Sequence, residues 1–249
     1  RIFCKRILGQ DTFAPRGADT QVRPYEPLKD CMSGDLYAIG DIHGSLESLE
    51  RLMDMINPDL TRDRLLFVGD YIDRGPQSRE VVDYIIRLKN LAPPGQIICL
   101  KGNHEAMLLE FLAGGPAEMF IFNGGRATVE QYWGDRWVDR EGLALPPDHA
   151  RFFQELELYY ETPDYIFVHG GLKPGVPLAG QVEDDLLWIR GEFITSQEDF
   201  GRRVVFGHTP FKQPLIMPNK IGIDTGAVYG NFLTAVKLPG EEFFFDRQF

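Results

Sequence analysis

The sequence predicts an α/β protein in which two β-sheets lie between outer helices, and two features of its pattern support this. Short apolar runs alternate with segments of helical periodicity from residue 36 to residue 100. A second series of short apolar runs fills much of residues 165–245, after a middle part with helical character. Strands that alternate with helices form right-handed crossovers and largely parallel sheets. We therefore expect helices to cover the outer faces of two sheets.

Three strands and two helices are expected in the first half of the chain. The strands, which are short and apolar, are residues 36–40, 65–68 and 96–100. Apolar residues repeat at helical spacing after each of the first two strands. Ser45 is the expected N-cap of the first helix and Pro58 ends it, while Ser78 precedes the second helix.

The rest of the chain is expected to be helical first and then rich in strands. Glycine and proline pairs break residues 105–160 into short helices. The later strands are residues 165–168, 203–206, 221–223, 232–236 and 242–245. Residues 35–249 form a single catalytic domain in this interpretation. Proline and glycine interrupt residues 1–34, which we interpret as an irregular N-terminal extension without the apolar core of a signal peptide.

The composition is that of a globular protein, and it excludes several classes. The 249 residues are 43% hydrophobic and 25% charged. No run approaches the ~18 apolar residues of a membrane span. The net charge of −11 argues against nucleic-acid binding, which needs a basic surface, but it is compatible with cation binding. Cys4, Cys31 and Cys99 are too few for a disulfide framework, so we expect free thiols, a cytoplasmic protein and a core position for Cys99.

Polar side chains beside glycine follow the predicted strands. The segments are GDIHG at 40–44, GDYIDRG at 69–75, GNHE at 102–105, HGG at 169–171 and GHT at 207–209. Ligands of α/β sheets bind at the carboxyl ends of strands. Four of the five histidines lie in these segments, and this recurrence favours a functional site over buried hydrogen-bonded turns. His149 lies outside them, and we interpret it as an exposed helix residue.

The side chains in these segments are typical ligands of divalent cations. Carboxylates, imidazoles and an amide, without sulfur, suit Mn²⁺, Fe²⁺ or Zn²⁺ rather than a cysteine-rich zinc site. The six candidates are Asp41, His43, Asp70, Asn103, His169 and His208. Six ligands exceed what one catalytic ion needs, whereas two ions about 3.5–4 Å apart with one bridging carboxylate use them all. We therefore expect two divalent metal ions as cofactors.

These motifs resemble the signature of the PPP family of metallophosphatases in their letters, order and spacing. The resemblance runs from about residue 36 to residue 236. It is closest to the bacterial and bacteriophage-lambda-type serine/threonine protein phosphatases, a subgroup also matched by residues 123–125, 187–190, 206–210 and 224–228. The resemblance implies a calcineurin-like metallophosphoesterase fold, with two mixed sheets sandwiched by helices and a metal site at the carboxyl ends of the strands.

The resemblance also implies how the metal ions are held. One ion is expected on Asp41, His43 and Asp70, and the other on Asp70, Asn103, His169 and His208, so that Asp70 bridges them. Mn²⁺ is the expected ion, and Fe or Zn²⁺ would accept the same ligands. A hydroxide that bridges the two ions would then attack phosphorus directly, without a phosphoenzyme.

Four further side chains are expected to be catalytic from the same resemblance. His104 is not a metal ligand in the family but the general acid for the leaving alkoxide, and Asp73 holds its other nitrogen. Arg74 and Arg190 are expected to bind phosphate oxygens. The residues alone leave open that either arginine is instead a surface residue paired with a carboxylate. Tyr229 edges the site by analogy.

The expected function is that of a metal-dependent protein serine/threonine phosphatase that hydrolyses phosphomonoesters, with phosphotyrosine as a further substrate class. Its partners would be phosphoproteins or phosphopeptides, with no nucleic acid and no membrane, and the enzyme would be a monomer.

The main alternative is a symmetrical bis(5'-nucleosyl)-tetraphosphate hydrolase. That related family tends to carry a neutral residue in place of Asp73 and an aspartate in place of Glu105. A catalytically dead binding module would lack a ligand, and none is missing here. A general phosphodiesterase fits two phosphate-binding arginines less well. Arg126 either reaches substrate or caps a helix.

Overall fold

A computed structural model describes residues 34–139 and 142–247 of the chain. The predicted N-terminal extension therefore lies outside the described residues, apart from Gly34, and so do Cys4 and Cys31. Within the described part of the chain, no helix is long and apolar enough to cross a membrane.

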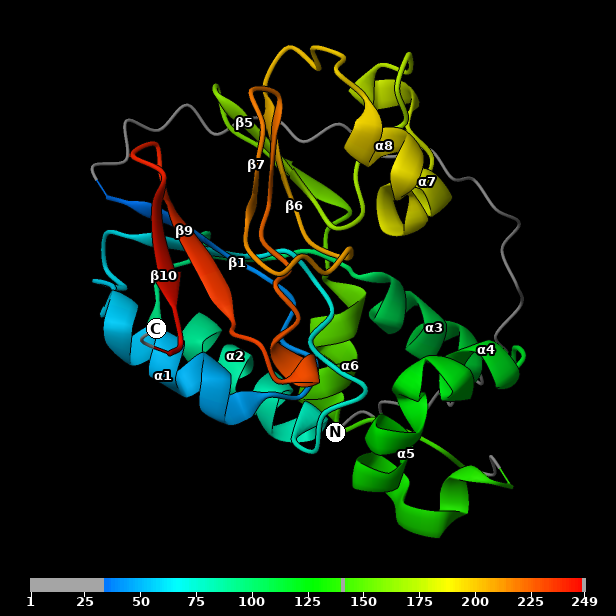
Figure 1. Ribbon diagram of the computed structural model, residues 1–249. Helices are drawn as coiled ribbons and strands as arrows, with labels where there is room; N and C mark the ends of the chain where they lie inside the picture. Colours follow the sequence, from blue (N-terminus) through cyan, green and yellow to red (C-terminus); the bar gives the residue numbers. More distant parts are fainter. Residues whose placement is uncertain (1–33, 140–141, 248–249) are drawn as a thin grey trace, which may run out of the picture.

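The first sheet has five strands in the order β10-β9-β1-β2-β3 (Figure 1). Their bounds are β1 Leu36–Ile39, β2 Arg64–Phe67, β3 Ile97–Cys99, β9 Thr234–Leu238 and β10 Glu242–Phe245. β1, β2 and β3 are parallel, while β9 pairs antiparallel with both β1 and β10. The parallel part is the one that alternates with helices in the sequence, because each parallel connection needs a crossover.

The second sheet also has five strands, in the order β4-β5-β6-β8-β7. Their bounds are β4 Tyr159–Glu161, β5 Tyr165–Val168, β6 Arg203–Phe206, β7 Leu215–Ile216 and β8 Lys220–Gly222. β5, β6 and β8 are parallel, and the two edge strands β4 and β7 are antiparallel to their neighbours. Both sheets are therefore mixed, as expected. The pattern did not predict β4 or β7, which are short edge strands defined by pairing.

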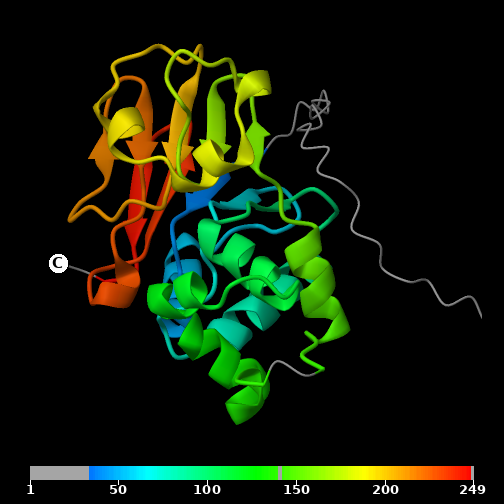
Figure 2. The same cartoon turned by 90° about the vertical axis from the view of Figure 1, so that its right-hand side faces the viewer.

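An apolar layer lies between the two sheets, and the alternation along β1 shows how it forms. Leu36 and Ala38 face this layer with Phe167 and Val205 of the second sheet. The intervening Tyr37 belongs to the other core, on the helical side of the first sheet. Successive side chains of a strand point to opposite faces, so four residues supply both cores. Figure 2 shows the yellow to orange strands of the second sheet above the blue to green helices on the far side of the first.

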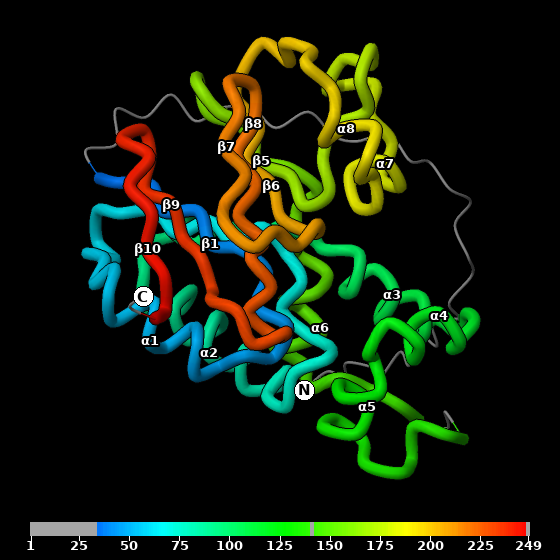
Figure 3. The backbone as a smooth tube through the Cα atoms, in the orientation of Figure 1, coloured from blue at the N-terminus to red at the C-terminus, as the bar shows by residue number. Residues whose placement is uncertain are grey.

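Helices cover the outer faces, as the sequence predicts. Those on the first sheet are α1 Leu46–Ile56, α2 Ser78–Leu91, α3 Asn103–Leu112, α4 Glu118–Phe120, α5 Arg126–Trp133 and α6 Pro147–Gln154. The two short helices α7 Glu183–Trp188 and α8 Gly191–Thr195 lie against the second sheet (Figure 3). Ser45 is the N-cap of α1 but makes no side-chain capping bond, and the helix ends before Pro58 as predicted.

The prediction that His149 is exposed is wrong. Its side chain is buried, with a residue exposure of 3%, because α6 packs against α2 and His149 contacts Tyr132 of α5. The Tyr132 hydroxyl lies 2.6 Å from His149 Nδ1, and Asp83 Oδ1 lies 2.9 Å from its Nε2. His149 thus joins three helices. Cys99 is buried in the core as predicted.

Candidate active site

The carboxyl ends of strands from both sheets meet in one region. β1, β2 and β3 of the first sheet and β5 and β6 of the second each lead into one of the glycine-flanked segments. Two hydrogen bonds join the sheets there. Asp41 Oδ2 accepts the backbone N–H of His208 at 2.8 Å, and His169 Nδ1 donates to the Val68 carbonyl at 3.0 Å. The six predicted metal ligands all lie in this region, and none is more than 4% exposed.

Asp70 and Asn103 lie at the centre of the cluster. Asp70 Oδ2 is 3.3 Å from His43 Nε2, and its Oδ1 is 3.4 Å from His169 Nε2. Asn103 Oδ1 lies 2.9 Å from His169 Nε2 and 2.9 Å from His208 Nδ1. The carboxylate of Asp70 therefore faces imidazoles on two sides, which is the arrangement that a bridging ligand requires.

Two of the histidines turn Nε2 toward the Asp70 carboxylate and bind a backbone carbonyl through Nδ1. His43 Nδ1 donates to the Ile72 carbonyl at 2.8 Å, and His169 Nδ1 donates to the Val68 carbonyl. A neutral imidazole carries one proton, so Nε2 of each is left as the electron-pair donor. Burial lowers the pKa of His169 to about 3 and holds the pKa of His43 well below its ordinary value. Both rings are therefore in the neutral state that metal ligation needs.

The cluster has the donor atoms that divalent cations bind, and some of these atoms have no partner within the described part of the protein. Among the described residues, Asp41 Oδ1 and His208 Nε2 are buried without a hydrogen-bond partner. Burial raises the pKa of Asp41 well above its ordinary value, and the nearby charges of Asp224 and Asp70 raise it further. Ligating atoms within 4.8 Å of one another form two groups, His43–Asp70–His104 and Asp70–His169–His208, which share Asp70. Bound cations would satisfy the orphaned atoms and the crowded carboxylates together.

Asp73 and His104 form a short buried pair beside the cluster. His104 Nδ1 lies 2.6 Å from Asp73 Oδ2, and both side chains are at most 1% exposed. Burial raises the pKa of Asp73 to about 8 and lowers the pKa of His104 to about 4, because each charged form loses its water. Asp73 thus engages Nδ1 of the imidazole and leaves Nε2 for other contacts. That nitrogen faces the cluster, 3.9 Å from Asp70 Oδ2.

The two predicted phosphate-binding arginines lie at the edge of the cluster. Arg74 is half-buried, contacts His43 Nε2 through Nη1, and stacks on the exposed Tyr229 ring with 5.5 Å between its Cζ and the ring centre. Arg190 Nη1 donates to the His208 carbonyl at 2.8 Å and to Thr209 Oγ1 at 3.2 Å. Across residues 34–139 and 142–247, neither guanidinium forms an ion pair with a carboxylate. The alternative that either arginine is a surface residue paired with a carboxylate therefore has no support.

The backbone of the site is held in an uncommon conformation. Seven non-glycine residues among those described have positive φ, and five of them are His43, Asp70, Asp73, Arg74 and His208. Non-glycine residues rarely have positive φ. Those that do are concentrated at functional sites, where the surrounding structure holds the backbone in place. The tight turns after the strands aim these five side chains at the cluster.

Two carboxylates of the site were not among the predicted functional residues. Glu105 is fully buried and accepts backbone N–H groups from Asp70, Tyr71 and Gly102, each at 2.9 Å. Asp224 follows β8, is 6% exposed, and accepts the N–H of Gly226 at 2.9 Å. Asp224 follows a strand and lies near Gly226, and the predicted metal ligands are recognised by this same pattern.

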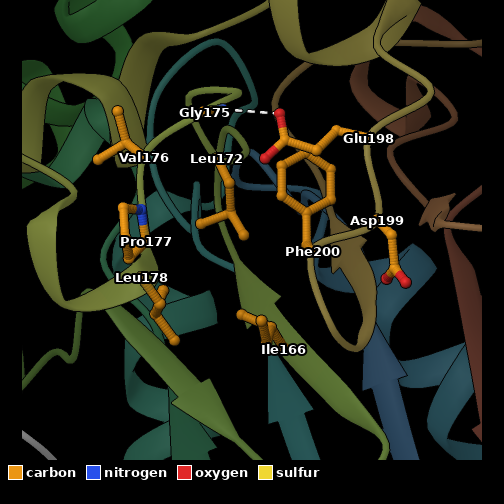
Figure 4. Close-up of a pocket in the computed structure, with 9 residues that line it drawn as sticks. All are labelled: Ile166, Leu172, Gly175, Val176, Pro177, Leu178, Glu198, Asp199 and Phe200. Atoms are coloured by element: carbon orange, nitrogen blue, oxygen red, sulfur yellow. Dashed lines mark hydrogen bonds between the residues drawn. The ribbon is translucent and has the colours of Figure 1, made fainter.

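Two other features lie apart from the cluster. Arg126 is exposed and donates through Nε to Glu130 Oε1 at 2.6 Å, so its partner lies within α5. Figure 4 shows a pocket of about 210 Å³ beside β5, lined by Leu172 and Phe200 among others. Glu198, which also lines the pocket, accepts the Gly175 N–H at 2.6 Å. We assign no catalytic role to either feature.

The arrangement of two mixed sheets with a buried carboxylate and histidine cluster at the strand ends defines a class of metal-dependent phosphoesterases. The chain belongs to the calcineurin-like phosphoesterase family, whose signature matches residues 35–231. That family uses a dimetal site, and the fold predicted from the sequence is confirmed.

Two kinds of phosphoesterase are found among its relatives. The asymmetrical bis(5'-nucleosyl)-tetraphosphatase PrpE of Bacillus velezensis is 28% identical over 230 residues, covering 82% of this chain and 89% of that protein. The protein of the same name from a Geobacillus strain is 30% identical over 236 residues, covering 81% and 89%. Serine/threonine-protein phosphatase 1 of Salmonella typhimurium is 28% identical over 212 residues, covering 82% and 91%. A solved structure of a candidate diadenosine tetraphosphatase has the same fold, with a TM-score of 0.68, 24% identity and coverage of 86% and 94%.

Proposed function

We propose that this phosphoesterase is a metal-dependent protein serine/threonine phosphatase that hydrolyses phosphomonoesters of phosphoproteins or phosphopeptides. The observation that carries the proposal is the 2.6 Å contact between Asp73 Oδ2 and His104 Nδ1, which turns His104 Nε2 toward the cluster, 3.9 Å from Asp70 Oδ2. A serine or threonine alkoxide is a poor leaving group, and its departure needs a proton donor. A phosphate leaving group of a polyphosphate needs a proton much less.

Six side chains supply the ligands in this proposal. Asp41, His43 and Asp70 would hold one divalent cation, and Asp70, Asn103, His169 and His208 the other. Two observations support this assignment. Asp41 Oδ1 is buried and unpartnered among the residues described, and His208 Nδ1 lies 2.9 Å from Asn103 Oδ1. When bound, the cations would acidify a water molecule and neutralise charge on phosphate.

The remaining residues act on the substrate itself. Arg74 lies in the first half of the sequence and Arg190 in the second. Neither guanidinium group pairs with a carboxylate among the described residues, so both have N–H donors for substrate. They would bind the non-bridging phosphate oxygens and orient the ester for in-line attack. The pair would carry two protons, one between Asp73 Oδ2 and His104 Nδ1 and one on His104 Nε2. The Nε2 proton would pass to the ester oxygen as the bond to phosphorus breaks. The other proton would stay on Nδ1 of a neutral imidazole, which leaves Asp73 as a carboxylate.

A second candidate is hydrolysis of dinucleoside tetraphosphates, which the names of several relatives favour. Those names specify asymmetrical cleavage, whereas the alternative expected from the sequence is symmetrical cleavage. The exposed Tyr229 ring beside Arg74 adds a structural reason, since a flat aromatic surface next to a phosphate-binding arginine can stack on a nucleobase.

One experiment separates the two candidates. Protein stripped with a chelator is assayed before and after addition of Mn²⁺, with a phosphoseryl peptide and with diadenosine tetraphosphate, and kcat/KM is compared. We expect phosphate release from the peptide that depends on metal and exceeds turnover of the dinucleotide. A kcat/KM that is about 100-fold higher for the dinucleotide would overturn the proposal. AMP and ATP as products would then indicate asymmetrical cleavage, and ADP alone symmetrical cleavage.

A further inference from the structure

Thr128, on α5, binds the Asp73 carboxylate on the side away from His104. Its side chain is fully buried. Thr128 Oγ1 donates to Asp73 Oδ1 at 2.6 Å and accepts the backbone N–H of Asp73 at 2.9 Å. The other carboxylate oxygen, Oδ2, is the one that meets His104 Nδ1. The two oxygens of Asp73 are therefore divided between a fixed hydroxyl and the imidazole.

The backbone around Asp73 needs this support. Asp73 and Arg74 have φ values of 73° and 68°, which are costly for residues with a side chain. The hydroxyl of Ser78 lies 3.0 Å from the Asp73 nitrogen and 3.2 Å from Thr128 Oγ1, so the turn is bound from two helices. A hydroxyl that touches both the backbone and the carboxylate of Asp73 sets the direction of that carboxylate.

The same segment also supports Arg74. The Arg74 N–H donates to the Gly124 carbonyl at 3.1 Å, two residues before α5 begins. Gly124 has a φ of 102°, and a Cβ there would lie 2.6 Å from Arg74 Cγ. Glycine is thus required for this close approach. Residues 124–128 hold in place both a phosphate-binding arginine and the partner of the proton donor.

We infer that Thr128 is a positioning residue for the Asp73–His104 pair. Its hydroxyl fixes the Asp73 carboxylate so that Oδ2 faces Nδ1 of His104, and this in turn aims His104 Nε2 at the cluster. The inference rests on the proposed role of His104 as general acid. Loss of the hydroxyl would loosen the pair without removing the imidazole, the metal ligands or the arginines.

Thr128→Val tests this because it keeps the shape of the side chain and removes only the hydroxyl. The readout is kcat with Mn²⁺ on a phosphoseryl peptide and on nitrophenyl phosphate, whose leaving group needs little protonation. We expect the peptide rate to fall about 10-fold, as for other residues that orient a catalytic histidine, and the nitrophenyl phosphate rate to change less than about 3-fold. Thr128→Ser restores the hydroxyl and should restore the peptide rate.

Two comparisons control for a merely structural role. Thr234→Val removes another buried threonine hydroxyl, which is 2.6 Å from Thr225 Oγ1 and remote from Asp73 in the chain, and should leave the ratio of the two rates unchanged. In a His104→Asn background, Thr128→Val should not change the ratio further, because the two residues act through one proton. Thr128→Ala serves the same comparison if the valine variant does not fold.

The outcomes separate this inference from the proposed function. Equal losses on both substrates in Thr128→Val, or a Thr128→Ser variant as impaired as the valine variant, would overturn the positioning role. If His104→Asn alters the ratio while Thr128→Val does not, only the inference about Thr128 fails. If His104→Asn lowers both rates equally, His104 is not the acid and the proposed mechanism fails with it.

Discussion

The carboxylate of Asp41 accepts the backbone N–H of His208 at 2.8 Å, although 167 positions separate the two residues. Asp41 follows a strand of the first sheet and His208 follows a strand of the second. This bond lies at the junction of the sheets, where the ligands contributed by each sheet become one cluster. The site therefore depends on the packing of the sheets and not on either sheet alone.

Replacement of Asp70 tests its position between the two groups of ligands. Asp70→Asn should weaken binding of both cations, because its two oxygens face His43 and His169 on opposite sides. The measurement is the number of Mn²⁺ ions retained after dialysis. Asp148→Asn, at an exposed position of α6, is the matched control. Two tightly held ions in Asp70→Asn would contradict the bridging assignment.

Replacement of His104 tests the proton donor. His104→Asn should lower kcat on a phosphoseryl peptide by about 10²–10⁴-fold and on nitrophenyl phosphate by much less, since nitrophenolate leaves without a proton. The measurement is the pair of rates at saturating Mn²⁺. His149→Asn is a useful control, because it removes a buried, carboxylate-bonded histidine that belongs to the helices instead of the site.

Replacement of the arginines tests phosphate binding. Arg74→Ala and Arg190→Ala should each lower kcat/KM by roughly 10- to 100-fold, the loss of a charge-assisted contact to phosphate. Lysine at either position should restore only part of the rate, because an ammonium cannot bind two oxygens in the same planar geometry. Arg126→Ala, which removes an exposed arginine paired within α5, should leave kcat/KM unchanged. Retention of full activity by Arg190→Ala would remove that residue from the site.

Replacement of Glu105 tests how the loop that carries Asp70 is held. Both carboxylate oxygens of Glu105 accept hydrogen bonds from backbone N–H groups. In Glu105→Gln one oxygen becomes an NH₂ group, which would face these donors and could not accept from them. The cost should be about 1–3 kcal/mol, or roughly 2–4 °C in Tm per kcal/mol for a chain of this size. Thermal unfolding in the presence of chelator measures this without a contribution from bound metal. Glu118→Gln, at an exposed position, should not lower the Tm.

The reactivity of Cys99 tests its burial. Burial raises the pKa of the Cys99 thiol to about 12, so little of the reactive thiolate exists at pH 8. In a Cys4→Ser, Cys31→Ser variant, Cys99 should resist a thiol reagent in the native protein and react fully in denaturant. Labelling of the native variant within minutes would contradict the core position.

Much of the site could be predicted from the sequence because strand ends carry local signals. Each predicted ligand follows a short apolar run and stands near a glycine, and both features are visible without knowledge of the pairing. Asp224 shows the same signal within the motif at residues 224–228. Glu105 belongs to the GNHE motif, but its three backbone contacts depend on how two loops meet.

Other features could not be predicted because they depend on contacts between distant segments. β4 and β7 are edge strands of three and two residues, defined by their neighbours and not by a pattern of their own. His149 lies outside the strand-end segments and is therefore expected on the surface of a helix, yet three helices bury it. Thr128 is an ordinary helix residue in the sequence, 55 positions from the aspartate that it binds.

The sequence by itself determined the order of the parallel strands and of the helices between them, the polar residues that follow these strands, and the family to which they point. These are consequences of periodicity and turn chemistry over a few residues, which act locally. Tertiary structure decided which strands pair, that the two sheets join at Asp41 and His208, and that α5 supports Asp73. Such contacts form only when apolar surfaces from distant parts of the chain pack together. The burial of these surfaces, and not the local sequence pattern, decides which backbone and side-chain groups meet.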